Sequence, residues 1–531
     1  MRVVARETLY FAGASPVAIA AVALSGVLMT GLSVAYEAFH GPTELIYHDP
    51  ARAYQGYTMF TPMLGRNAYL IDMNGEVIHT WPIPPSWRDP EIRENARLLA
   101  DGMLARSKTV GDGSTRGTYQ LVGWDGEVVW EHELDREDLS GHHDFRFIWN
   151  PKLGQRTLMY SATRVTSHEA VIALGADPAL RESYATRPDG LVELDMEGNI
   201  VWEWNISDHV VQDIDPGLSG YGVVSEHPGK LDINFGRGVS GNWIHMNAFD
   251  YNPVLDHVVI NNSRMSEFYV VDHGATFVPG DPERSRELAA GDAGDFIYRW
   301  GNPCVSDTGE CPSMTAEGMV TSNGDQQVFF AHDIQWIDDR YFGALEQPVP
   351  GAGHFLIFNN GARQPGPSFS SVIEIDPYQG PMADGVYVSP AVAGYERATV
   401  GGGMSSGTQN VSRQVVWSFH GVSPNSFYSP FISGAQRLPN GNTLVCSGAH
   451  GHMFEVTPEG NVVWEYINPV GDRLHNDRGI YRVMTDKAGD EFNSIFKCHR
   501  YSPDFAGLDG KDLTPKGTIT EFFSEAVEEK P

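Results

Sequence analysis

Basic residues are scarce in this sequence. There are 37 lysines and arginines against 68 aspartates and glutamates, which gives a net charge of −31 at pH 7. A surface this acidic repels the phosphate backbone of nucleic acids, so we expect no nucleic-acid partner. The same acidity is typical of proteins adapted to salt, in which case it carries no functional information. Hydrophobic residues at 41% and aromatic residues at 11% exclude a mainly disordered or fibrous chain.

Cysteine is also scarce, with four residues in 531. Cys304 and Cys311 enclose a short loop, CVSDTGEC, whose composition suits a local disulfide in an oxidising compartment. Cys446 and Cys498 lie in apolar segments typical of strands. We predict that they are buried free thiols, and a bond between them is the alternative. No CxxC pair indicates a zinc site.

Long apolar runs are absent, with one exception at the N-terminus. Residues 17–36 form an apolar run of 20 residues, which as a helix spans about 30 Å. Arg2 and Arg6 precede this run, and the positive-inside rule then places the rest of the chain on the exported side. We predict an uncleaved transmembrane anchor at residues 1–37 and a body in the periplasm. A cleaved signal peptide is the alternative.

One pattern occurs six times along the chain: a turn with Asn, Asp or Gly, followed by a β-branched or aromatic strand that contains tryptophan. The six segments are NGEVIHTW (74–81), DGEVVWEHEL (125–134), EGNIVWEWNI (197–206), GDFIYRWGNP (294–303), SRQVVWSFHG (412–421) and EGNVVWEYIN (459–468). In five units another strand ends close to the turn, which indicates a hairpin. In the fourth unit the matching strand, 266–272, lies further upstream.

Further strands precede each hairpin, so each unit has about four strands, and we find no helical pattern between the units. Repeated four-stranded antiparallel sheets predict an all-β fold, a six-bladed β-propeller. A pair of β-sandwiches would not repeat the motif six times. We predict that residues 493–505 complete the first blade. The propeller then covers residues 38–510, and residues 511–531 form a short polar tail.

Histidines gather where three of the predicted blades begin. The first strand of each blade lines the central channel of a propeller, so these side chains should converge. The segments are GHHDFRF with His142 and His143, NWIHMNAFDYN with His245 and Asn247, and FFAHDIQWID with His332. Arg264 and Arg363 follow in two of the same blades, and His450 is a further candidate. Such a cationic funnel favours an oxyanion, although a three-histidine zinc site is also open.

The segments HHDF, WIHMN, AHDIQW, NNSR, FNNGARQP and AQRLPNGNTLV resemble those of the bacterial arylsulfate sulfotransferases, and the resemblance covers roughly residues 50–510. It implies a six-bladed propeller that moves a sulfuryl group from an aryl sulfate to a phenol without the nucleotide donor PAPS. The implied reaction is ping-pong and passes through a sulfohistidine. It requires no cofactor, although the acidic loops leave structural calcium open.

The resemblance also implies roles for single residues. By motif, the nucleophile falls on His332. His143, His245, Asn247 and Arg264 fall on positions that contact the sulfuryl oxygens or the ester oxygen. His143 or His245 would act as the acid and base. We add Arg363, His142 and His450 as candidates for substrate binding, without a defined role.

Two other functions are open at this point. Some family members carry an extra N-terminal domain that makes a dimer, and here we expect none, because only about a dozen residues separate the apolar run from the first strand region. The expected lack of a dimer domain, the long inserts and the predicted anchor together favour a non-catalytic propeller subunit that binds membrane-protein partners. A metal-dependent hydrolase or lyase in the same funnel is the third interpretation.

Overall fold

The computed structural model describes residues 43–522. The gaps within this range are 64, 88–91, 111–116, 179–185, 237–240, 316–319, 379–386, 388–394, 400–407, 423–425 and 471–492. The predicted transmembrane helix at residues 1–37 therefore lies outside the described residues. Within the described part of the chain, no helix is both long and apolar enough to cross a membrane.

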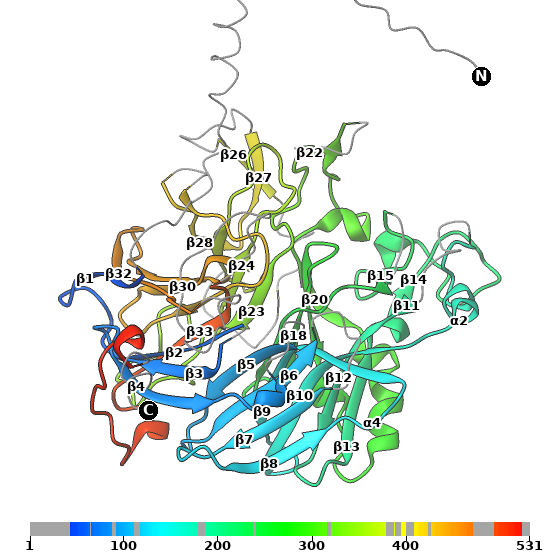
Figure 1. Cartoon of the computed structure of the whole chain (residues 1–531). Helices are drawn as coiled ribbons and strands as arrows, with labels where there is room; N and C mark the ends of the chain where they lie inside the picture. Colours follow the sequence, from blue (N-terminus) through cyan, green and yellow to red (C-terminus); the bar gives the residue numbers. More distant parts are fainter. Residues whose placement is uncertain are drawn as a thin grey trace, which may run out of the picture. The chain divides into compact units, whose positions relative to one another are not determined.

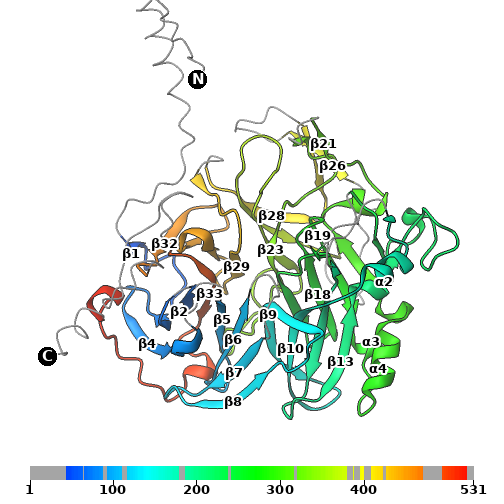
Figure 2. The same ribbon diagram turned by 45° about the vertical axis from the view of Figure 1, so that its right-hand side comes forward.

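The described residues form six antiparallel sheets that follow one another around a centre in sequence order (Figures 1 and 2). From the inner strand outward, blade 1 has β33 (Ile495–Tyr501), β2 (Tyr57–Pro62), β3 (Asn67–Ile71) and β4 (Val77–Pro82). Blade 2 has β5 (Ile92–Leu98), β6 (Leu104–Val110), β7 (Thr118–Val122) and β8 (Val128–Glu133). Blade 3 has β9 (Leu139–Asn150), β10 (Gln155–Arg164), β12 (Asp189–Leu194) and β13 (Ile200–Asn205).

The other half of the ring repeats this arrangement. Blade 4 has β17 (Phe249–Asn252), β18 (His257–Asn262), β19 (Glu267–Asp272) and β20 (Phe296–Trp300). Blade 5 has β23 (His332–Trp336), β24 (Phe355–Asn359), β25 (Ser371–Ile375) and β28 (Val415–Phe419). Blade 6 has β29 (Gly434–Arg437), β30 (Thr443–Ser447), β31 (His452–Val456), β32 (Val462–Ile467) and a fifth strand, β1 (Glu44–His48). The prediction of a six-bladed propeller is confirmed.

Shorter elements lie in the inserts between these strands. The short strands are β11 (Thr186–Arg187), β14 (Val210–Val211), β15 (Leu231–Asp232), β16 (Gly241–Asn242), β21 (Ser313–Met314), β22 (Val320–Ser322), β26 (Tyr395–Thr399) and β27 (Thr408–Ser412). The helices are α2 (His168–Ala173), α3 (His273–Thr276) and α4 (Pro282–Ala289), with 3-10 turns η1 (Pro85–Trp87), η3 (Ile206–Asp208), η4 (Val224–Glu226), η5 (Asp292–Gly294), η6 (Pro303–Ser306), η8 (Gly448–His450) and η9 (Ala506–Leu508).

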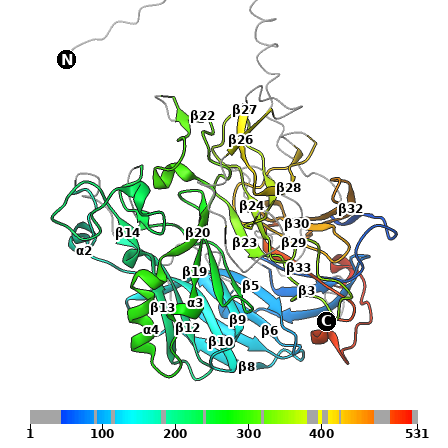
Figure 3. The ribbon, with the colours of Figure 1, turned by 180° about the vertical axis from the view of Figure 1, so that it is seen from behind.

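The expectation that no helix lies between the repeats is wrong for α4, which lies beside β13 (Figure 3). Its sequence, PERSRELA, is largely polar, so it carries no clear apolar stripe. The start signal was nevertheless present, because Asp281 caps the helix by accepting from the backbone N–H of Arg284, and a proline follows the cap. Arg286 then forms an ion pair of 3.0 Å with Glu203 of β13.

The repeated tryptophan joins each blade to the next. In all six segments the indole N–H donates to a group of the following blade. The pairs are Trp81 to the carbonyl of Gly123, Trp130 to that of Met196, Trp202 to the hydroxyl of Thr276, Trp300 to that of Ser412, Trp417 to the carbonyl of Pro458 and Trp464 to that of Met73, at 2.8 to 3.1 Å. The last bond connects blade 6 to blade 1. The inter-blade tryptophans therefore give the sequence repeat its physical reason.

Both ends of the described chain contribute to closing the ring. β33 pairs with β2, with Tyr501 opposite Tyr57 and Cys498 opposite Phe60. This confirms that the C-terminal segment completes the first blade. Residues 511–522, predicted as part of a polar tail, pack on the same blade, because the N–H of Val77 donates to the carbonyl of Gly517 and Ile519 is fully buried.

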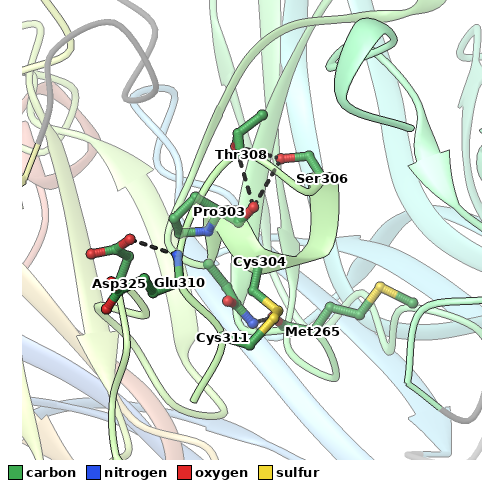
Figure 4. The surroundings of a disulfide bond; sticks show 9 residues. Met265, Pro303, Cys304, Ser306, Thr308, Glu310, Cys311 and Asp325 are labelled. Carbon is green, nitrogen blue, oxygen red and sulfur yellow. Dashed lines mark hydrogen bonds between the residues drawn. A yellow bond between two sulfur atoms is a disulfide. The ribbon is translucent and has the colours of Figure 1, made fainter. Parts of the chain in front are cut away.

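The cysteine predictions are confirmed. Cys304 and Cys311 form a disulfide across the turn after β20, and the N–H of Glu310 beside it donates to Asp325 at 2.7 Å (Figure 4). Cys446 and Cys498 are free thiols, and both are buried.

Trp464→Phe should destabilise the protein by about 1–3 kcal/mol, because it leaves the Met73 carbonyl without its donor while keeping an aromatic ring in place. Unfolding in urea, followed by fluorescence or circular dichroism, measures the loss. Trp149→Phe is the matched control, since Trp149 is 61% exposed and is not one of the inter-blade tryptophans. Equal losses in the two variants would refute the role of the hydrogen bond.

Candidate active site

The inner strands all begin at the same end of the channel, which we call the channel mouth; they end at the far end. His142 and His143 lie near the start of β9, His245 precedes β17 and His332 is the first residue of β23. The loops after β18, β24 and β30 return to the mouth, because each strand runs antiparallel to its inner neighbour. These loops carry Arg264, Arg363 and His450, so the predicted site residues gather on one face.

His332 is held by an asparagine that the sequence analysis did not select. Its Nδ1 lies 2.6 Å from Oδ1 of Asn360. The Nδ2 group of Asn360 donates to the carbonyls of Ser429 and Ile432, at 2.8 and 2.9 Å, which fixes its oxygen toward the imidazole. An amide oxygen can only accept, so Nδ1 of His332 carries the proton and Nε2 keeps a lone pair.

The other histidines form a contiguous group. Nδ1 of His142 lies 2.8 Å from Nδ1 of His143, so one of the two nitrogens donates to the other. The rings of His143 and His245 meet edge to face, with centroids 4.7 Å apart. His332 is close enough to lower the pKa of His143 by its charge, and the charge of His245 in turn lowers the pKa of His332.

Burial keeps the imidazoles of His143, His245 and His332 neutral. It is the largest cause of the low pKa of His332 and of His245, each about 4, and the neighbouring cationic groups add to it. The pKa of His143 is lowered well below its usual value for the same reasons. A neutral imidazole with a free lone pair can act as a nucleophile.

Asp189, at the start of β12, fixes the loop that carries His245. Its two carboxylate oxygens accept from the backbone N–H groups of Ile244 and Met246, both at 3.0 Å. One of them also lies 3.4 Å from Nε2 of His142. Burial alone would raise the pKa of Asp189, but these contacts outweigh it and the pKa is lowered. The carboxylate is therefore charged, and it holds the backbone on both sides of His245.

Backbone strain is concentrated at this site. His143, His245, Phe330, Asp333 and Arg363 all have positive φ, between 49° and 65°. Non-glycine residues rarely adopt this region, and such strain accumulates where side chains must be held in a particular direction.

The remaining predicted residues lie around the histidines. The backbone N–H of Arg264 donates to the carbonyl of Ile244, the residue before His245. The guanidinium of Arg363 lies over the ring of Phe330, 5.2 Å from its centroid. Nε2 of His450 contacts the carbonyl of Tyr428 at 3.0 Å.

Asn247 lies behind the site. Its Nδ2 donates to the carbonyl of Ala331, the residue before His332, at 3.0 Å, and its Oδ1 accepts from Asn261. The structure therefore places Asn247 against the backbone that carries His332, in a positioning role.

A small apolar cluster lies beside the histidines at the mouth. Met63, Ile432 and Phe496 are each less than 9% exposed and pack against one another. The ring of Phe496 is 6.4 Å from that of His143. This wall offers a surface for an aromatic ring next to the imidazoles.

A network of buried ion pairs fills the channel beneath the histidines. Lys497 of β33 binds Asp144 at 2.9 Å and Asp333 at 2.7 Å. These two carboxylates directly follow His143 and His332 in the sequence. Gly434 allows the close approach of β29, since a Cβ there would collide with the carboxylate of Asp333. Lys497 thus holds the two His-Asp segments at a fixed separation.

Two arginines extend this ion network. Arg97 of β5 and Arg146 of β9 both bind Asp144, at 3.0 and 2.9 Å, and Arg146 also binds Asp250 at 3.2 Å. Each of blades 1 to 5 contributes at least one charged side chain to the network. Blade 6 contributes a backbone group, since the N–H of Ala435 donates to Asp333.

Sequence reasoning missed Asn360, Asp189 and Lys497. Asn360 belongs to the FNNGARQP segment, from which only Arg363 is predicted as a site residue, and two consecutive asparagines at the end of a strand are a signal in themselves. A single lysine in the apolar strand SIFKCHRY indicates a buried charge with a partner. In the described ranges, no group of three or more His, Cys, Asp or Glu side chains is arranged to hold a metal ion.

The fold and site define a six-bladed propeller with a cluster of neutral histidines at one end of its channel. A family model described as "Arylsulfotransferase (ASST)" matches residues 60–276. This match supports the arylsulfotransferase family for the chain and confirms the resemblance seen in the sequence; it also supports arylsulfotransferase activity in general. It includes His142, His143, His245, Asn247 and Arg264.

Comparison with solved structures finds more distant likenesses. A protein of unknown function from Bacteroides caccae has 10% identity and a TM-score of 0.38, over 84% of this chain and 99% of that one. A functionally unknown protein from Desulfotomaculum acetoxidans has 8% identity and a TM-score of 0.33, over 85% and 100%. These scores are too low to support an argument. Comparison with curated proteins gives no match.

Lys497→Met should destabilise the protein by about 3–5 kcal/mol, because it leaves the carboxylates of Asp144 and Asp333 buried without the cation between them. Chemical denaturation measures the loss. Lys511→Met is the control, since Lys511 is partly exposed and contacts only the face of Trp124 among the described aromatic rings. A similar, small loss in both variants would contradict the bridging role.

Proposed function

We propose that the protein transfers a sulfuryl group from an aryl sulfate to a phenolic acceptor through a sulfated His332. The observation that carries this proposal is the contact of 2.6 Å between Nδ1 of His332 and Asn360, which leaves Nε2 as the nucleophilic atom. The family match supports the general activity, and the ping-pong route through His332 is our own inference.

In the first half-reaction, Nε2 of His332 attacks the sulfur and the bond between sulfur and the ester oxygen breaks. The phenolate leaves, and the sulfuryl group stays on the imidazole. Because the ring keeps its proton on Nδ1, it carries positive charge in the adduct. Oδ1 of Asn360 stabilises that charge where it develops, without a change of geometry.

The sulfuryl oxygens need positioned donors, since charge spreads over them in the transition state as it does in phosphoryl transfer. Arg264 is suited to this because its backbone is bonded to Ile244, the residue before His245, and a guanidinium binds two oxygens in a fork. The aryl ring is expected against Met63, Ile432 and Phe496, the apolar wall beside His143.

His143 is the better candidate for the acid and base, because it ends a chain of contacts that begins at Asp189. If Nε2 of His142 donates toward Asp189, then Nδ1 of His142 accepts from His143, and Nε2 of His143 is left to exchange a proton with substrate. A bound anion raises the pKa of a nearby imidazole, which favours the protonated form when the donor is present.

The second half-reaction reverses the first. His143 takes the proton from the acceptor phenol, whose oxygen attacks the sulfur on His332, and later gives that proton to the next leaving phenolate or to water. The bond between nitrogen and sulfur breaks, the aryl sulfate product leaves and His332 returns to its neutral state. The route needs no cofactor, because the imidazole itself carries the group.

Exposure to 4-nitrophenyl sulfate without acceptor should add one SO3 group to the peptide that contains His332, detected by mass spectrometry under alkaline handling. His332→Ala should lose the adduct and lower nitrophenol release by at least about 10³-fold, because the nucleophile is gone. His227→Ala is the control, since His227 is exposed and lies in an insert. Adduct formation at another histidine, or full turnover by His332→Ala, would overturn the proposal.

The low pKa of His332 sets the pH dependence with this donor, whose phenolate leaves without needing a proton. A pKa depressed to about 4 keeps the imidazole neutral until the pH falls through that value. We therefore expect kcat/KM to stay level from neutral pH down to about pH 5 and to fall only below it. A decline centred near about pH 6.5, the ordinary value for histidine, would contradict this.

A further inference from the structure

A cavity lies at the far end of the channel. Its volume is about 160 Å³. It is lined by the ends of inner strands and the turns that follow them: Arg97, Leu98, Leu99, Ala100, Ala105, Phe145, Arg146, Phe147, Ile148, Arg340, Tyr341 and Phe505. The ion network lies between this cavity and the histidines. Arg97 and Arg146 line the cavity, and both bind Asp144, the residue after His143.

The charged residues that line the cavity are all arginines. Arg97, Arg146 and Arg340 contribute guanidinium groups, and no acidic residue is among the described residues of the lining. Each of these guanidiniums is already paired with a carboxylate. The side chains of Asp144 and Asp250 are fully buried, whereas that of Asp338, which also binds Arg340, is 33% exposed.

One of these guanidiniums has a donor to spare. Arg146 is only 7% exposed; its Nε binds Asp250, and its Nη1 binds Asp144 and the carbonyl of Phe145. Its Nη2 donates to none of the described residues. This group can donate to a ligand or to water, and Arg146 borders the cavity.

The rest of the lining is flat and apolar. Phe145, Phe147, Tyr341 and Phe505 border the space together with aliphatic side chains. The volume is about half the lower end of the usual range for ligand pockets, which limits the occupant to a single ring or a body of similar size. Guanidinium groups bind carboxylates and related oxyanions in pairs of hydrogen bonds, and aromatic walls stack on flat rings.

We propose that the far end of the channel is a second ligand site, which binds a small aromatic anion such as an aryl carboxylate or sulfonate. The anionic oxygens accept from Nη2 of Arg146, and the ring packs between the aromatic side chains. This site is distinct from the catalytic mouth. It goes beyond the proposed sulfuryl transfer and does not depend on it.

Benzoate is the probe, with benzamide as its neutral counterpart of the same shape, titrated into the full chain by calorimetry without any sulfuryl donor. We expect saturable binding of benzoate and at least tenfold weaker binding of benzamide. Arg340→Gln removes one cation from the lining and should weaken the binding of benzoate at least tenfold. Ala100→Trp, a change at an exposed position of the rim, should block entry without touching the ion network.

Two variants serve as controls. Arg156→Gln alters another ion-paired arginine, whose side chain is 32% exposed against 27% for Arg340, and should leave benzoate binding unchanged. Arg264→Gln alters the catalytic mouth and should also leave it unchanged.

Three results would overturn the proposal. They are the absence of saturable binding, unchanged binding in both Arg340→Gln and Ala100→Trp, and loss of binding in Arg264→Gln, which would place benzoate at the mouth. Because the titration contains no donor, none of these results bears on whether His332 accepts a sulfuryl group.

Discussion

The hydrogen bond from each inter-blade tryptophan to the next blade is the constraint on which the ring depends. A propeller blade pairs only within itself, so the angle between neighbouring sheets must come from side-chain contacts. The six indoles supply a directional contact at equivalent positions, and the bond from Trp464 to Met73 closes the circle. The candidate site needs this closure, because its histidines come from blades 3, 4 and 5 while the apolar wall comes from blades 1 and 6.

Inside the ring, the ion network links the blades to one another and so fixes the positions of the site residues. Asp144 and Asp333 each follow a site histidine, and both bind Lys497. Each carboxylate is tied to a strained backbone, since His143 and Asp333 have positive φ. Buried charges of this kind contribute little net stability, but they tolerate few alternative arrangements. We infer that the network fixes the directions in which the histidine side chains point, so that the imidazoles stay oriented without a bound substrate.

The sequence predicted the blade count, the closure of the first blade and the disulfide, because each depends on a local signal: a turn, a tryptophan strand or two cysteines close in the chain. It also predicted that the histidines share one face, since topology alone brings blade starts together. It missed Asn360 and Asp189, because their contacts with the site depend on strand register and side-chain direction. It missed α4 because a short polar helix has no apolar stripe, although Asp281 and the following proline mark its start.

The acidic composition and the chemistry of the site are compatible because charge is distributed unevenly. Asp144, Asp250 and Asp333 are neutralised by Arg97, Arg146 and Lys497 within the channel. A neutral histidine cluster can then lie above this balanced layer, and burial lowers the imidazole pKa values far enough to keep the lone pair of His332 free. A funnel of protonated histidines would attract an anionic ester more strongly. A protonated imidazole, however, has no lone pair with which to attack. In the proposed reaction, this arrangement would favour the reactivity of the imidazole over long-range attraction and leave oxyanion binding to arginines such as Arg264.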